Sequence, residues 1–227
     1  MTPRDAALEA LLQMERRGAW SDGSLKRITV QAGLDGRDAA LCTHLTYGVV
    51  QNRTLLDFYI DGWCSQRAAR LETVVACALR LGIYQILFMD KVPDRAAVHE
   101  TVELVKRHGK SRAAGMVNAV LRKCAASKNA LPPLPYKGAA ERLTVQYSHP
   151  KWLVERLIAL VGEQETEEFL RLDNEPVPTV IQTNTLKTTP DALAKELRAS
   201  GVQVQAHPWL TGCFEVTGTG DMARLPA

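Results

Sequence analysis

Apolar residues recur at helical spacing through the first half of the chain. Thr2-Pro3 can begin the first helix, because a hydroxyl caps a helix well and proline suits its first position. The stripe that follows is formed by Ala7, Leu8, Leu11, Leu12 and Met14. Residues recurring every three or four positions share one face of a helix, so this stripe predicts a face packed on a core.

The same spacing predicts further helices up to residue 126. They are expected at about 24–32, after Asp35, at 54–61, at 71–89, from Asp94 and from Ser111. Residues 71–89 are apolar on nearly every side, which is typical of a buried central helix. No long segment alternates with a period of two, so this part is predicted to be all-α.

The pattern changes after a proline-rich stretch. Pro132, Pro133 and Pro135 indicate a linker over residues 129–138, which divides the chain into domains 1–128 and 139–227. The second domain is expected to be a smaller α+β unit with two helices followed by β-α-β-β. One of the two helices begins at His149-Pro150, and the other covers 163–173. The later elements are expected to be a strand at 179–184, a helix from Thr189-Pro190, and strands at 202–206 and 213–217.

Composition and charge refine this picture. The 227 residues are 46% hydrophobic and 23% charged, values that argue against a disordered chain. No apolar run approaches the roughly 20 residues of a membrane span, and no apolar signal segment opens the sequence. The five cysteines are widely spaced with no CxxC pair, so we expect free thiols, a cytoplasmic protein and no membrane partner.

The net charge of +3 is unevenly distributed. Residues 1–129 carry +6 and residues 130–227 carry −3, so a polyanion is expected to bind the first part. A merely solvated basic surface is the alternative.

Two short motifs suggest chemistry but lack the residues that it needs. His99-Glu100-Thr101-Val102-Glu103 begins like a zinc-protease motif, yet a second histidine is missing four residues on, and we predict no metal site. Gly218-Thr219-Gly220-Asp221 is too near the last residue, Ala227, for a cofactor-binding helix to follow, so a simple turn is expected. Cys42 and Cys77 fall on apolar stripes and are predicted to be buried and inert. No residue is assigned a catalytic or cofactor-binding role.

Basic residues gather at the ends of two predicted helices. Such clusters suit a phosphate backbone, although cations are also favoured at helix C-termini by the helix dipole. The candidate RNA-binding residues are Arg4, Lys106, Arg107, Lys110, Arg112, Arg122 and Lys123. Arg112 and Arg122 lie about 15 Å apart along one helix, so a stripe or two patches is expected rather than one pocket.

Asn118 lies among Val117, Ala119, Val120 and Leu121. Because a buried amide must find hydrogen-bond partners, we expect it to bridge to a neighbouring helix or loop rather than contact RNA.

Several segments together resemble a known family. Leu45–Val50, Leu79–Leu87 and Ala97–Leu104 are similar to helices of the NusB-like RNA-binding domain, and Gly115–Arg122 resembles it most sharply. Tyr147–Val154 resembles the entry to the RsmB (Sun, Fmu) family of ribosomal RNA cytosine-5 methyltransferases, and Thr183–Thr188 resembles that family's first strand of the small subdomain.

The resemblance implies a substrate-recognition region of an enzyme that methylates 16S ribosomal RNA with S-adenosylmethionine. The family's catalytic domain, with its cofactor loop and two catalytic cysteines, has no counterpart here. We therefore expect an inactive N-terminal portion, monomeric, whose partners are 16S ribosomal RNA and the absent methyltransferase domain.

Two alternatives remain open, a stand-alone antitermination-type RNA-binding factor and a protein-docking module. Two residues depart from the family. His99 stands where asparagine is frequent, and Gln182 stands where an arginine often precedes Thr183-Asn184, which puts an RNA contact from that strand in doubt.

Overall fold

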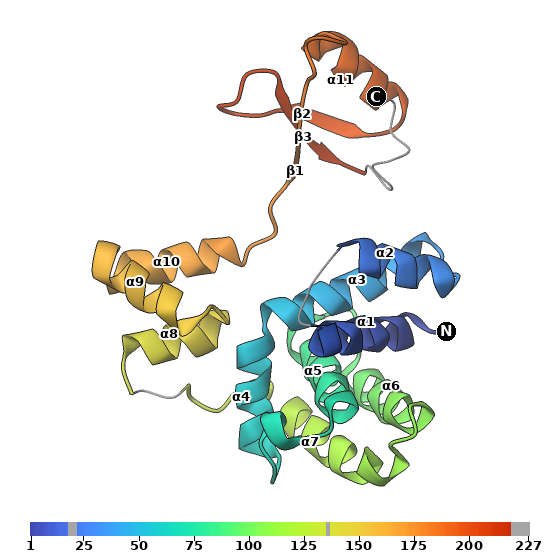
Figure 1. Ribbon diagram of the computed structural model, residues 1–227, viewed down its shortest axis with the longest axis vertical. Coiled ribbons are helices and arrows are strands. Elements are labelled where there is room, and N and C mark those ends of the chain that lie inside the picture. Colours follow the sequence, from blue (N-terminus) through green and yellow to red (C-terminus); the bar gives the residue numbers. More distant parts are fainter. Residues whose placement is uncertain (18–21, 135–136, 219–227) are drawn as a thin grey trace. The chain divides into compact units, whose positions relative to one another are not determined.

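The computed structural model describes residues 1–17, 22–134 and 137–218 (Figure 1). The chain forms two compact units, a helical unit of residues 1–174 and a C-terminal unit of residues 175–227.

Seven α-helices and two short 3-10 helices lie in residues 1–17 and 22–127, the described portion of the first part of the helical unit. They are α1 (Pro3–Arg17), α2 (Asp22–Gln31), α3 (Gly36–Gln51), α4 (Arg53–Trp63), η1 (Ala68–Arg70), α5 (Thr73–Phe88), α6 (Asp94–Arg107), η2 (Ser111–Ala113) and α7 (Ala114–Ser127). The all-α prediction for this part is confirmed.

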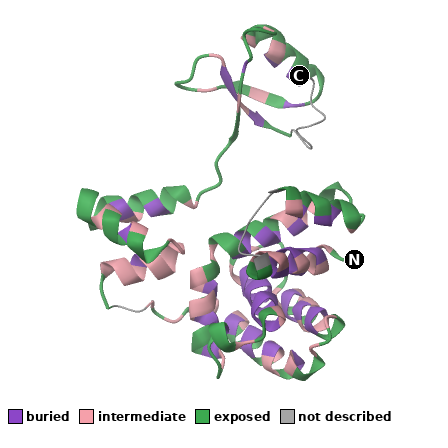
Figure 2. Ribbon diagram, in the orientation of Figure 1, coloured by how far each residue is buried: buried purple, intermediate pink, exposed green. Residues whose placement is uncertain are grey.

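Helix α5 is the centre of this part, as its apolar sequence predicts. Every residue from Val75 to Ile86 is buried, and α5 contacts α1, α3, α4, α6 and α7 (Figure 2). A helix with no polar face can be stable only when neighbours cover it on all sides.

One charged residue of α5 is buried with the apolar ones. Arg80 is 6% exposed, and its guanidinium donates to both carboxylate oxygens of Asp57 at 2.7 and 2.9 Å and to Glu15 at 3.0 Å. These hydrogen bonds compensate the cost of removing the cation from water and join α5 to α1 and α4.

Cys42 and Cys77 are buried, which confirms that expectation. Burial raises the pKa of the Cys42 thiol and raises that of Cys77 to about 11, so both thiols stay protonated and unreactive near neutral pH.

The described residues 137–174 form three further helices, where the sequence predicts only two. They are α8 (Ala139–Tyr147), α9 (Lys151–Val161) and α10 (Glu163–Asp173). Helix α8 is the additional one. They share a small core of Leu143, Val154 and Leu170.

Helix α8 also contacts α4, and the Ser148 hydroxyl accepts a hydrogen bond from the Leu55 backbone N–H at 3.1 Å. For this reason α8, α9 and α10 cluster with the first seven helices, and the compact units divide after Asn174. The division into domains 1–128 and 139–227 around a linker stays a prediction.

The C-terminal unit has the predicted order β-α-β-β. It consists of β1 (Thr179–Gln182), α11 (Pro190–Ala199), β2 (Gln203–Ala206) and β3 (Cys213–Thr217). The sheet is antiparallel with the order β1-β3-β2, and α11 contributes Ala194 and Leu197 to its core. Thr189 caps α11 by accepting from the Ala192 N–H, as a Thr-Pro start predicts. The structure thus confirms an all-α part followed by a smaller α+β part.

Candidate nucleic-acid interface

Six of the seven basic residues predicted to bind RNA lie on α6, on α7 or in the turn between them, and Arg4 lies on α1. Gly109 has a φ of +75° in this turn, a conformation that glycine adopts without strain, and η2 then leads into α7. The C-terminal end of α6 and the N-terminal end of α7 are thereby brought close together.

Two separate hollows form on these elements. The α6–α7 groove, about 870 Å³, is lined by Asp94, Arg95, Val98, His99, Val102, Glu103, Lys106, Asn118, Arg122 and Ala125. The turn hollow, about 410 Å³, is lined by Glu72, Gly109, Lys110, Ser111, Arg112 and Ala113. Arg112 and Arg122 therefore line different hollows, and an RNA-binding stripe or pair of patches stays a prediction.

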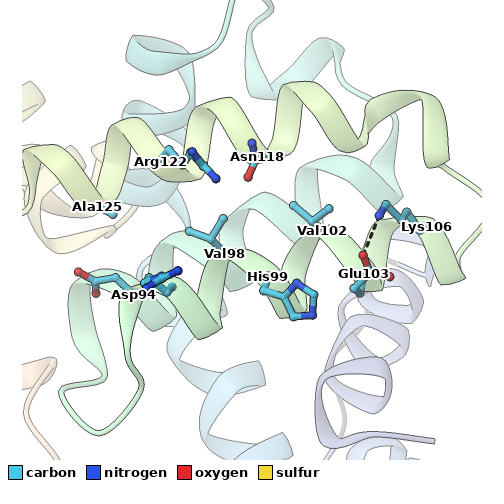
Figure 3. Close-up of a pocket in the computed structure, with 10 residues that line it drawn as sticks. Asp94, Val98, His99, Val102, Glu103, Lys106, Asn118, Arg122 and Ala125 are labelled. Atoms are coloured by element: carbon cyan, nitrogen blue, oxygen red, sulfur yellow. Dashed lines mark hydrogen bonds and ion pairs between the residues drawn. The ribbon is translucent and has the colours of Figure 1, made fainter.

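Four predicted residues line these hollows. Lys106 lies in the groove and forms an ion pair with Glu103 at 2.7 Å, which lowers the pKa of that carboxyl group (Figure 3). Arg122 is exposed in the groove, and Arg112 is exposed in the turn hollow. Neither arginine forms an ion pair with any residue that the structure describes. Lys110 forms an ion pair with Glu72.

The other three predicted residues are held by contacts within the protein. The Arg4 guanidinium donates to Gln85 Oε1 at 2.7 Å, and Lys123 Nζ donates to the Trp63 carbonyl at 3.3 Å. Arg107 forms an ion pair with Asp5 at 3.2 Å, which joins the beginning of α1 to the end of α6. Burial raises the pKa of Asp5, but hydrogen bonds from Thr2 and Arg107 outweigh this effect and the pKa lies below its ordinary value.

The expectation for Asn118 is wrong. Its side chain is half-buried and, among the described residues, its amide has no hydrogen-bond partner. Figure 3 shows the amide extending from α7 toward α6, into the groove. The apolar neighbours that suggested a buried bridge, Val117, Val120 and Leu121, point into the core instead, because they occupy the other face of α7.

Arg95 also lines the groove, although it is not among the residues predicted from the sequence. Arg95, His99, Val102 and Lys106 follow one another at intervals of four, three and four residues, so they share one face of α6. This helical spacing in the sequence could have identified the face of α6 that lines the groove.

His99 and Glu103 of the zinc-protease-like motif both line the groove. Within residues 1–17, 22–134 and 137–218, no three His, Cys, Asp or Glu side chains are arranged to hold a metal ion. No helix in these ranges is long and apolar enough to cross a membrane. Of the motif Gly218–Asp221, only Gly218 falls within the described residues.

Two family models match the chain in succession. The model of the NusB family matches residues 1–126, and the model described as the RsmF/B-like methyltransferase ferredoxin-like domain matches residues 149–223. The order of these two matches is the one that the sequence resemblance implied.

Curated proteins and solved structures are similar to the chain over long stretches. "Probable ribosomal RNA small subunit methyltransferase B" of Bacillus subtilis is 32% identical over 203 residues, which are 89% of this chain and 45% of that protein. The chain spans about half the length of the curated relatives that it matches.

Among solved structures, the crystal structure of PH0851 aligns with 96% of this chain and 49% of that chain, with a TM-score of 0.66 and 20% identity, and shows the fold alone. The crystal structure of antitermination factors NusB and NusE in complex with dsRNA aligns with 55% of this chain and 94% of that one, with a TM-score of 0.50 and 25% identity.

Proposed function

Because the chain belongs to the NusB family through its residues 1–126, we propose that it is the RNA-binding, substrate-recognition region of a 16S ribosomal RNA cytosine-5 methyltransferase that uses S-adenosylmethionine. The observation that carries the proposal is the succession of a NusB match and an RsmF/B-like match in one chain. A stand-alone antitermination-type factor would need only the first match, so the second disfavours that alternative.

The geometry supports RNA binding by the helical unit. Arg112 and Arg122 present guanidinium groups that no carboxylate of the described residues neutralises, while Lys106 and Lys110 lie in the same two hollows. Contacts of this kind to phosphates orient an RNA on a protein without reading its sequence.

S-adenosylmethionine supplies the methyl group in such a reaction, but the described residues do not fit it. A nucleotide-type cofactor site uses a strand, a glycine turn and a helix in a parallel crossover. Strands β1 and β2 run parallel on either side of β3 and are joined through α11, but residues 183–189 between β1 and α11 contain no glycine. We assign the cofactor to none of these residues.

The second proposed partner is a methyltransferase domain outside this chain. Trp152 and Leu160 on α9 and Phe169 and Leu172 on α10 are large apolar side chains exposed on the helical unit. Exposed apolar side chains in such number are typical of a surface that another domain covers.

We propose that the protein acts as a monomer in the cytoplasm, where its RNA substrate is made.

The proposal is tested by filter binding of the purified chain to a 16S ribosomal RNA transcript and to an unrelated transcript of equal length. We expect tighter binding to the 16S transcript at the same salt concentration, because a recognition region must discriminate its substrate. Equal affinity for the two transcripts would contradict substrate recognition, and no binding to either would contradict the RNA-binding function altogether.

A further inference from the structure

The α6–α7 groove contains an amide that the protein itself does not use. Asn118 offers two N–H donors and one carbonyl acceptor, and among the described residues none of these groups is paired (Figure 3). An amide with adjacent donors and acceptor matches the edge of a nucleobase, which presents the same kinds of groups side by side.

The charges of the groove favour an anionic occupant. Its two carboxylates are already compensated, since Asp94 pairs with Lys128 at 3.5 Å and Glu103 pairs with Lys106 at 2.7 Å. Arg95 and Arg122 remain without an ion pair among the described residues. Arg122 follows Asn118 by one helical turn, about 6 Å, so a group bound at Asn118 lies next to a cation.

The floor of the groove is apolar. Val98 and Val102 of α6 point toward α7, and Ala125 adds a methyl group from α7 (Figure 3). A flat base can cover such a surface with its face while its edge meets the amide, and the volume of about 870 Å³ has room for a nucleotide.

We propose that the α6–α7 groove binds one unpaired nucleotide of single-stranded RNA, with the base edge on the Asn118 amide and a neighbouring phosphate on Arg122. The RNA must be single-stranded here, because a base in a duplex has its Watson–Crick edge occupied. This inference rests on the proposed RNA-binding function and adds to it a site that distinguishes bases from backbone.

The test compares Asn118→Ala with Asn129→Ala, a matched control at an exposed asparagine outside the groove lining. Fluorescence anisotropy is measured on the four homopolymeric RNAs of about 12 nucleotides and on an abasic ribose-phosphate oligomer of the same length. Asn118→Ala should lower the affinity for at least one homopolymer about tenfold. It should leave the affinity for the abasic oligomer unchanged. Its melting temperature should match that of the wild type, because no partner in the protein is left unsatisfied.

Arg122→Ala should weaken binding to every oligomer, including the abasic one, and lower the salt slope by about one. Two results would overturn the proposal. In the first, Asn118→Ala binds all four homopolymers as Asn129→Ala does, which would leave the groove to another occupant such as a peptide. In the second, Asn118→Ala weakens binding to the abasic oligomer as much as it weakens binding to the homopolymers.

Failure of the underlying function gives a different result. If the wild-type chain binds none of the oligomers and no 16S transcript, the RNA-binding function itself is wrong. In another outcome, replacing Lys110 and Arg112 weakens binding to every RNA, while Asn118→Ala changes the affinity for none of them. The RNA-binding function would then stand, and the proposed site in the α6–α7 groove would be wrong.

Discussion

Gly48 lies where helix α3 meets the ring of Tyr84 on α5. A Cβ atom at this position would lie 1.9 Å from the ring, and the ring is held by stacking on Phe88 and by a hydrogen bond between its hydroxyl and His44. Gly48→Ala should therefore lower the free energy of unfolding by about 1–3 kcal/mol or more, measured by urea denaturation.

Gly62→Ala is the matched control for this substitution. Gly62 is also helical, but a Cβ atom there would meet nothing within 4 Å. Alanine should then stabilise the protein by about 0.5–1 kcal/mol, because glycine is the poorer helix former. Equal effects of the two substitutions would show that contact with Tyr84 does not decide the outcome.

At the scale of elements, ion pairs join α8 to α10. Arg142 donates to Glu167 at 2.7 and 3.0 Å and to Glu163 at 3.1 Å, and the Tyr147 hydroxyl donates to Glu167 at 3.2 Å. The hydrogen bond from Arg142 is the main cause that holds the pKa of Glu167 below its ordinary value.

A carboxyl group with a lowered pKa stabilises the fold above its unfolded pKa, and this contribution is lost as the pH falls through the folded pKa. The stability of α8–α10 should thus decrease as the pH falls below about 4.5. Glu167→Gln should reduce the stability at neutral pH and flatten this acid dependence, as followed by hydrogen exchange of α8 amides. An unchanged acid profile in Glu167→Gln would contradict the assignment.

The elements also show what a sequence can predict. Helix α5 was predictable because its residues are apolar on all sides, and α11 because Thr189-Pro190 marks its start. Helix α8 was missed because it has only one fully buried residue, Leu143, and depends on contacts with α4 and α9. The orientation of the Asn118 side chain was not predicted, because residue spacing along one helix does not show where a neighbouring helix leaves a groove.

For the whole molecule, the chain alone should transfer no methyl group. In the proposed reaction a cysteine thiolate attacks the cytosine base, whereas Cys42, Cys77, Cys124 and Cys213 are buried here and Cys64 lies against the Met116 sulfur at 3.6 Å. Incubation with 16S ribosomal RNA and labelled S-adenosylmethionine should give no labelled RNA. Incorporation above a protein-free control would refute this expectation.

The salt dependence of RNA affinity shows whether the turn between α6 and α7 contacts the RNA backbone. The logarithm of affinity should fall linearly with the logarithm of salt concentration, because phosphate contacts release counterions. Replacing Lys110 and Arg112 together by alanine should weaken binding and reduce the slope by roughly one or two units. The control, Arg156→Ala with Lys195→Ala, removes two exposed cations elsewhere and should leave the slope unchanged. A wild-type slope in the Lys110 and Arg112 variant would contradict the claim that this surface of the helical unit holds the RNA backbone.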